Sequence, residues 1–163
     1  MKEYYNQILN LIKDDARIST EDMSKVLGLA IGDVESAIDE MIAEGIIVKY
    51  STIINGEKLQ RDLVSALIEV RVTPQKDMGF DQIAEEIAAY KEVKSLYLMS
   101  GGYDLAVIAE GSSLREISNF VHEKLAIIEN VTSTATHFML KSYKLEGVIL
   151  DGDLTEKRLP VQP

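Results

Sequence analysis

The apolar residues of the first 45 positions recur every three to four residues, which is the spacing of an amphipathic helix. Three such stretches follow one another, separated by short turns. Their apolar positions are Tyr5, Ile8, Leu9 and Ile12; then Met23, Val26 and Leu27; then Val34, Ile38, Met41 and Ile42. Ser19 is placed to cap the second stretch, and Gly28 is placed to end it. The pattern predicts three short helices packed through tight turns.

The period changes to two after these helices. Val48, Tyr50, Thr52 and Ile54 alternate with the residues between them, and Asn55-Gly56 provides a turn. This alternation predicts a two-stranded wing. Three helices followed by a hairpin describe a winged helix-turn-helix, which we expect to occupy residues 1–55, with a polar hinge over residues 56–62.

The rest of the chain predicts a second, α+β domain over residues 63–145. Alternating apolar positions predict strands from Leu63 to the residue before Pro74, and over 93–99, 103–109 and 131–140. Helical spacing predicts helices over 80–88 and 114–125. The order β-α-β-β-α-β is the ferredoxin-like arrangement, a four-stranded antiparallel sheet with both helices on one face. We expect residues 146–163 to be a loose C-terminal tail rather than a strap over a neighbouring subunit.

A sheet covered by helices on one side leaves its other face open. Alternation along the last strand places one set of residues on one side, and we expect this set to belong to the open face; it comprises Thr132, Thr134, Thr136, Phe138 and Leu140. A second copy of the chain is the simplest cover for such a face, so we predict a homodimer or a higher homo-oligomer.

Composition narrows the class of protein. The 163 residues are 46% hydrophobic, which predicts a folded chain. Because there is no cysteine, disulfides and thiolate metal sites are excluded, and because no apolar run approaches about 20 residues, no membrane span is expected. We expect a soluble, cytoplasmic protein. The net charge of −10 is unfavourable for a general phosphate binder.

The sequence contains few residues suited to catalysis or to metal binding. The two histidines, His122 and His137, have neither a nucleophile nor a carboxylate at a motif spacing, and a zinc site needs three or four ligands. Four scattered tyrosines lack the basic neighbours of a single-strand binding platform. We expect that the protein is not an enzyme and that it binds neither a metal ion nor a cofactor.

The segment Ser100-Gly101-Gly102-Tyr103-Asp104 has two interpretations. Paired glycines suit a tight hairpin turn without any ligand. The backbone N–H groups of Gly101 and Gly102 are also suited to hold a carboxylate, and Asp104 to pair with an ammonium group. An α-amino acid presents both groups, so the segment is a candidate effector site.

The whole chain before the tail resembles the Lrp/AsnC family of feast/famine transcription regulators. In the first domain the resemblance rests on the segments 15–19, 27–29 and 44–47, and in the second on 100–104, Val131 and 134–136. It implies DNA binding by the first domain and recognition of an amino acid or related metabolite by the second. The matching positions add Ser100, Tyr103, Thr134 and Thr136 to the expected effector site. Gly102 stands where the family commonly has Asp.

The resemblance also implies that the third helix enters the major groove. That helix carries five acidic residues between 31 and 44 and no Lys or Arg, and residues 1–60 hold 6 basic and 11 acidic side chains. A solvated acidic helix without any role at DNA also explains this pattern. The expected contacts to double-stranded DNA come from hydroxyls, lysines and a helix N-terminus, namely Ser19, Lys25, Gly32, Ser36, Lys49 and Lys58.

The sequence thus predicts a transcription regulator that binds double-stranded DNA under the control of a small metabolite. In an assembly of several chains, the DNA-binding first domains, which we call heads, would add their weak individual contacts to DNA. The alternative is a metabolite sensor or assembly partner that has little DNA affinity of its own and joins related subunits.

Overall fold

The computed structural model describes residues 3–59, 63–73 and 79–150. The chain divides into two compact units after Ile53. Each unit has its own hydrophobic core. None of the described helices is long and apolar enough to cross a bilayer.

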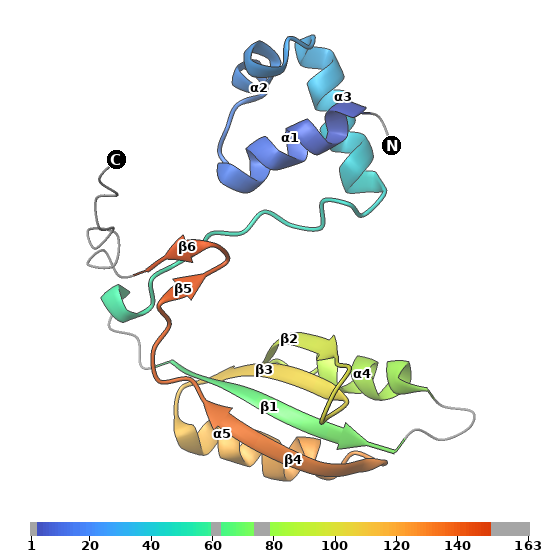
Figure 1. Cartoon of the computed structure of the whole chain (residues 1–163), viewed down its shortest axis with the longest axis vertical. Coiled ribbons are helices and arrows are strands. Elements are labelled where there is room, and N and C mark those ends of the chain that lie inside the picture. Colours follow the sequence, from blue (N-terminus) through green and yellow to red (C-terminus); the bar gives the residue numbers. More distant parts are fainter. Residues whose placement is uncertain (1–2, 60–62, 74–78, 151–163) are drawn as a thin grey trace, which may run out of the picture. The chain divides into compact units, whose positions relative to one another are not determined.

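The first unit contains the three predicted helices (Figure 1): α1 is Glu3–Asp14, α2 is Thr20–Leu27 and α3 is Ile31–Ala43. Their inward faces form one buried cluster, which comprises Tyr5, Ile8, Met23, Val34, Ala37 and Met41. Both predicted ends of α2 are confirmed. The Ser19 side chain accepts a hydrogen bond from the Asp22 backbone N–H, and Gly28 adopts the left-handed conformation, with φ of 67°.

The predicted wing is not formed in the described chain. Residues 48–55 contain no strand, and the side chain of Val48 is 87% exposed. A hairpin needs a turn in the middle of the segment, whereas Asn55-Gly56 lies at its end and leads into a short 3-10 helix, Glu57–Leu59. Among the described residues, the alternating apolar positions before this turn therefore have no second strand to pair with.

The second unit contains the predicted four-stranded antiparallel sheet. Its strands are β1 (Val64–Val72), β2 (Val93–Leu98), β3 (Leu105–Gly111) and β4 (Val131–Phe138), in the spatial order β2-β3-β1-β4. The helices are α4 (Phe80–Ala88) and α5 (Leu114–Phe120), and α5 continues into a π-helical turn, η2 (Val121–Leu125). The ferredoxin-like order is confirmed.

Both helices pack on one face of this sheet (Figure 1). Alternate residues of β1, among them Ile68 and Val70, are fully buried against Ile83 and Ile87 of α4 and Ile117 of α5. On the opposite face, Leu67 lies between Ile108 of β3 and His137 of β4 in the strand register. The second face carries no helix of the described chain.

The expectation for the side chains of β4 is wrong. The register pairs Thr134 with Val70, Thr136 with Ile68 and Phe138 with Ala66, and these three partners all face the helices. Side chains of directly paired residues lie on the same face of a sheet. Thr134, Thr136 and Phe138 therefore belong to the covered face, and Phe138 packs against the core. Alternation along one strand cannot tell which set faces inward when, as here, both sets mix polar and apolar residues.

The chain after β4 is also more ordered than expected up to Leu150. Strands β5 (Lys144–Leu145) and β6 (Val148–Ile149) form a hairpin whose turn residues, Glu146 and Gly147, both have positive φ. The Asn55 Nδ2 donates a hydrogen bond to the Leu150 carbonyl at 3.0 Å. The expectations for Pro74, for hinge residues 60–62 and for tail residues 151–163 lie outside the described residues.

Candidate DNA-binding and effector sites

The packing of α3 determines which of its residues face outward. Val34, Ala37 and Met41 are buried. At 100° per residue, the opposite side of the helix carries Gly32, Ser36 and Asp39, all of them exposed. In a helix-turn-helix this outward side of the second helix is the one that meets base edges.

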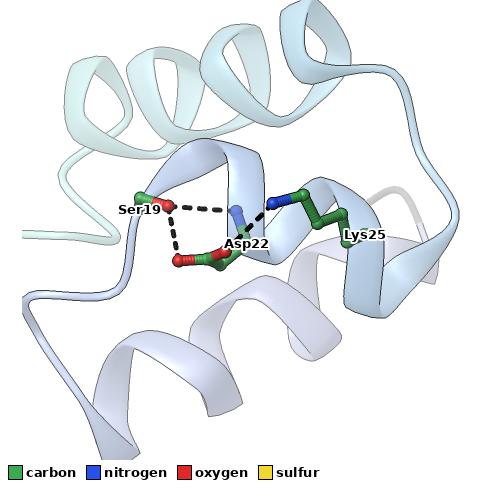
Figure 2. A network of polar contacts seen from close by, with 3 residues as sticks. All are labelled: Ser19, Asp22 and Lys25. Carbon is green, nitrogen blue, oxygen red and sulfur yellow. Dashed lines mark hydrogen bonds and ion pairs between the residues drawn. The ribbon is translucent and has the colours of Figure 1, made fainter.

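Two of the expected phosphate contacts, Ser19 and Lys25, lie on either side of Asp22 (Figure 2). The Ser19 hydroxyl donates to Asp22 Oδ2 at 2.8 Å, and the Lys25 Nζ lies 3.4 Å from Asp22 Oδ1. These hydrogen bonds, that from Ser19 first and that from Lys25 second, lower the pKa of Asp22. The side chains of Lys25 and Asp22 are 75% and 61% exposed, so the pair is weak enough for a phosphate to displace.

Two of the acidic residues on α3 have partners within the first unit. The Thr20 hydroxyl donates to Glu35 at 3.5 Å, and the Tyr5 hydroxyl donates to Glu40. These contacts connect α3 to α2 and α1. They give part of the acidic character of the helix a structural role.

The other expected DNA contacts are dispersed. Gly32 and Ser36 lie together on the outward side of α3, and Lys49 is exposed in the segment that follows the helix. Lys58 lies in the 3-10 helix of the second unit. In the first unit, Ser19 and Lys25 thus belong to α2 and its N-cap, whereas Gly32 and Ser36 belong to α3.

In the second unit, Asp104 is fixed to β1. Its backbone N–H donates to the Val70 carbonyl at 3.1 Å, and its Oδ2 accepts from the Val72 N–H at 2.9 Å. The Met99 N–H donates to the Asp104 carbonyl at 2.8 Å and closes the loop. Asp104 thus extends the sheet by one rung past the start of β3, and one carboxylate oxygen is committed to the backbone.

The loop before Asp104 is open. Ser100, Gly101 and Gly102 are exposed, Tyr103 is half-buried, and a Cβ added at either glycine would meet no atom within 4 Å. The backbone at these two glycines is therefore not covered by neighbouring side chains. This is the accessibility that the sequence interpretation of the loop requires.

The expected threonines lie on the other side of β1. Thr134 pairs with Val70, the same residue that Asp104 contacts from the β3 side, and Thr136 lies two residues further along β4. Two strand spacings of about 4.8 Å separate Asp104 and Thr134 at this level of the sheet. One copy of the chain therefore presents the loop and the threonines as two neighbouring groups.

The structure contains an ion pair with a buried carboxylate that was not predicted from the sequence. Glu92 is 6% exposed, its Oε1 lies 2.8 Å from the Lys124 Nζ of η2, and its Oε2 has no hydrogen-bond partner among the described residues. Burial raises the pKa of Glu92, but the hydrogen bond from Lys124 lowers it, and the net direction is downward. The only sequence signal was a glutamate between the apolar residues Tyr90 and Val93.

Among the described residues, neither histidine belongs to a group of candidate metal ligands. His122 is exposed on η2, and the Nε2 of His137 lies 3.3 Å from Glu69 Oε1 on the open face of the sheet. In the part of the chain that the structure describes, no three His, Cys, Asp or Glu side chains are grouped to hold a metal ion.

Two family models match the chain. A winged helix-turn-helix DNA-binding model covers residues 6–48, and an Lrp/AsnC ligand-binding domain model covers residues 65–149. They correspond to the two compact units.

Known proteins of the same kind resemble the chain over most of its length. An uncharacterised helix-turn-helix transcriptional regulator of Bacillus subtilis, YugG, is 38% identical and covers 100% of this chain and 99% of its own. The structure of Escherichia coli AsnC covers 89% of this chain and 95% of its own, with a TM-score of 0.70 and 19% identity. The Neisseria meningitidis transcriptional regulator NMB0573, solved as a complex with L-methionine, covers 94% and 99%, with a TM-score of 0.71 and 21% identity.

The matched models and the names of these relatives are those of transcription regulators rather than of enzymes. The helix-turn-helix of the first unit and the ferredoxin-like sheet of the second are the parts that these models describe. The chain is a DNA-binding transcription regulator of the Lrp/AsnC family.

Proposed function

We propose that this regulator is controlled by an α-amino acid or a closely related metabolite, which binds at the loop Ser100–Asp104. The observation that carries the proposal is the open Gly101-Gly102 backbone beside the carboxylate of Asp104, which is fixed to β1. A free amino acid has one anionic and one cationic group. The loop offers N–H donors for the first and a carboxylate for the second.

Thr134 and Thr136 supply hydroxyls near this loop, with β1 in between. A ligand at an interface between two copies would contact the loop of one copy and the threonines of the other. Such a ligand changes activity through its different affinity for alternative assemblies, without touching DNA. The L-methionine complex of NMB0573 supports an amino acid as the class of effector.

We further propose that the chain works as a homodimer or a higher homo-oligomer in the cytoplasm. The open face of the sheet carries apolar side chains between polar ones, including Leu67, Ile108 and the 55% exposed Tyr97. A second copy is a partner of matching composition. Assembly places several DNA-binding heads on one duplex, which offsets the acidity of each head.

An electrophoretic shift tests this function. The DNA is the fragment upstream of the chain's own coding sequence, at low salt, with and without each of the twenty amino acids and the common keto acids. We expect a shift at micromolar protein that at least one ligand strengthens or weakens. If none of these mixtures shifts the DNA, the proposed function is wrong. If the DNA is shifted but no ligand changes the shift, the proposal of an amino-acid effector is wrong.

The acidic α3 favours a second function, that of a sensor subunit with little DNA affinity of its own. Such a subunit would join a basic homologue and lower the affinity of the mixed assembly. Purification of mixed oligomers after co-expression with a basic homologue of the same genome distinguishes the two functions. The sensor function requires that the mixed oligomer bind DNA more weakly than the homologue alone.

A further inference from the structure

The side of α3 opposite its buried face carries Asp39 near its centre, and Glu35, four residues earlier, lies about 40° to one side of it. The neighbours of Asp39 one helical turn away on that side are Ser36 and Ala43, and Gly32 is the next residue towards the N-terminus. Asp33, by contrast, lies six residues before Asp39 and about 120° round the helix. Asp39 is therefore the ionised group best placed to meet a base edge.

Within the described part of the chain, the carboxylate of Asp39 has no competing partner. Glu35 and Glu40, on either side of it, accept hydrogen bonds from Thr20 and Tyr5. No hydrogen bond or ion pair engages Asp39 within the described residues, and its side chain is exposed. A free acidic group on the outward side of α3 requires a hydrogen-bond donor when the helix approaches DNA.

The major groove offers few such donors. A carboxylate only accepts hydrogen bonds, and guanine presents two acceptors, N7 and O6, which repel it. Adenine presents its N6 amino group beside its own acceptor N7, whereas cytosine presents its N4 amino group and has no major-groove acceptor of its own. α3 also has no Arg or Lys, the residues that commonly read guanine.

We propose that Asp39 determines operator specificity by accepting a hydrogen bond from the N4 amino group of a cytosine in each half-site. This inference rests on the proposed binding of DNA by the homo-oligomer. The acidic character of α3 then helps to select the DNA sequence, because Asp39 disfavours guanine at the base that it faces. The overall affinity comes from phosphate contacts elsewhere on the head.

Selection from a random duplex library by the full-length chain tests the inference. We expect the wild-type sequence to enrich a motif with cytosine at one position of each half-site, preferred over other bases by at least about fivefold. Asp39→Asn should change that position to adenine, because an amide pairs with both N6 and N7 of adenine. Asp39→Ala should lose the preference at that position alone.

Asp33→Asn is the matched control, because it removes the same charge from the same helix on a different side. It should keep the cytosine. If Asp39→Asn and Asp39→Ala enrich the wild-type motif unchanged, Asp39 does not read the base, and DNA binding by the chain stands. If the wild-type chain enriches no motif at all, both this inference and the proposed function fall.

Discussion

At the scale of single residues, Asp22 lies in the first turn of α2, where we propose that the first unit contacts a phosphate. It binds both Ser19 and Lys25, two of the side chains expected at the DNA backbone (Figure 2). The sequence indicated Ser19 as a cap and Lys25 as a cation, but it did not indicate that one carboxylate engages both. A three-residue spacing on a helix allows such pairs, and only the structure shows which rotamers form them.

Asp22→Asn should strengthen DNA binding. The change removes a negative charge beside the phosphates and releases Lys25. We expect affinity at low salt to rise by about twofold to tenfold, with the gain shrinking as salt screens the contact. Fluorescence anisotropy on one duplex at several salt concentrations measures it. Asp14→Asn, the same change at the end of α1, is the control; equal effects of the two variants would contradict a local contact.

Asp104 combines a structural and a ligand-binding role, and two substitutions separate them. Asp104→Ala removes the acceptor for the Val72 N–H, which should cost about 1–3 kcal/mol of unfolding free energy. Asp104→Asn retains an acceptor oxygen and should fold nearly as stably as wild type, yet without the charge that pairs with an ammonium group. Thermal shifts with each of the twenty amino acids should then lose any response seen for the wild-type chain. An unchanged response in Asp104→Asn would exclude ammonium pairing.

At the scale of elements, helices with one apolar face and strands between two turns were predictable from local pattern. α2 illustrates this, since Ser19 and Gly28 mark both of its ends in the sequence. The orientation of β4 was not predictable, because Thr134 and Thr136 face the core by virtue of their register with β1. The wing was predicted but is not formed in the described chain, and the β5–β6 hairpin was not predicted, for a related reason: strand pairing depends on partners that a local pattern does not identify.

Gly28→Ala should destabilise the head by about 1 kcal/mol, because alanine is strained at φ of 67°. No neighbouring atom lies within 4 Å of the added Cβ, so the effect is one of backbone conformation alone. Gly32→Ala is the control, since Gly32 lies inside α3 without a positive φ and alanine there should be neutral or stabilising. Urea unfolding followed by circular dichroism measures both. Equal stabilities would contradict the left-handed end of α2.

The pair between Glu92 and Lys124 should make the second unit sensitive to acid. The pKa of Glu92 is lowered in the folded state, so its contribution is fully present above the unfolded pKa and is lost as pH falls through the folded pKa. Glu92→Gln should cost about 1–3 kcal/mol at pH 7 and much less near pH 3. Urea unfolding at both pH values measures this. Glu110→Gln, which affects the exposed pair with Lys94, should change little at either pH.

At the scale of the whole molecule, the two-unit organisation and the family were predictable, while the assembly of the candidate sites was not. The sequence of segment 100–104 predicted a turn. The position of this turn relative to Thr134 depends on strands β3 and β4, which pair with β1 and are far apart in the sequence. The net charge of −10 opposes any single contact with DNA. We therefore propose that this regulator presents more than one DNA-binding unit to the same duplex.

The affinity of the full-length chain for duplexes with one or two copies of its selected half-site, placed whole helical turns apart, tests this proposal most directly. We predict that the duplex with two half-sites binds at least about tenfold more tightly than the duplex with one. Equal affinities for the two duplexes would contradict binding through cooperating acidic heads.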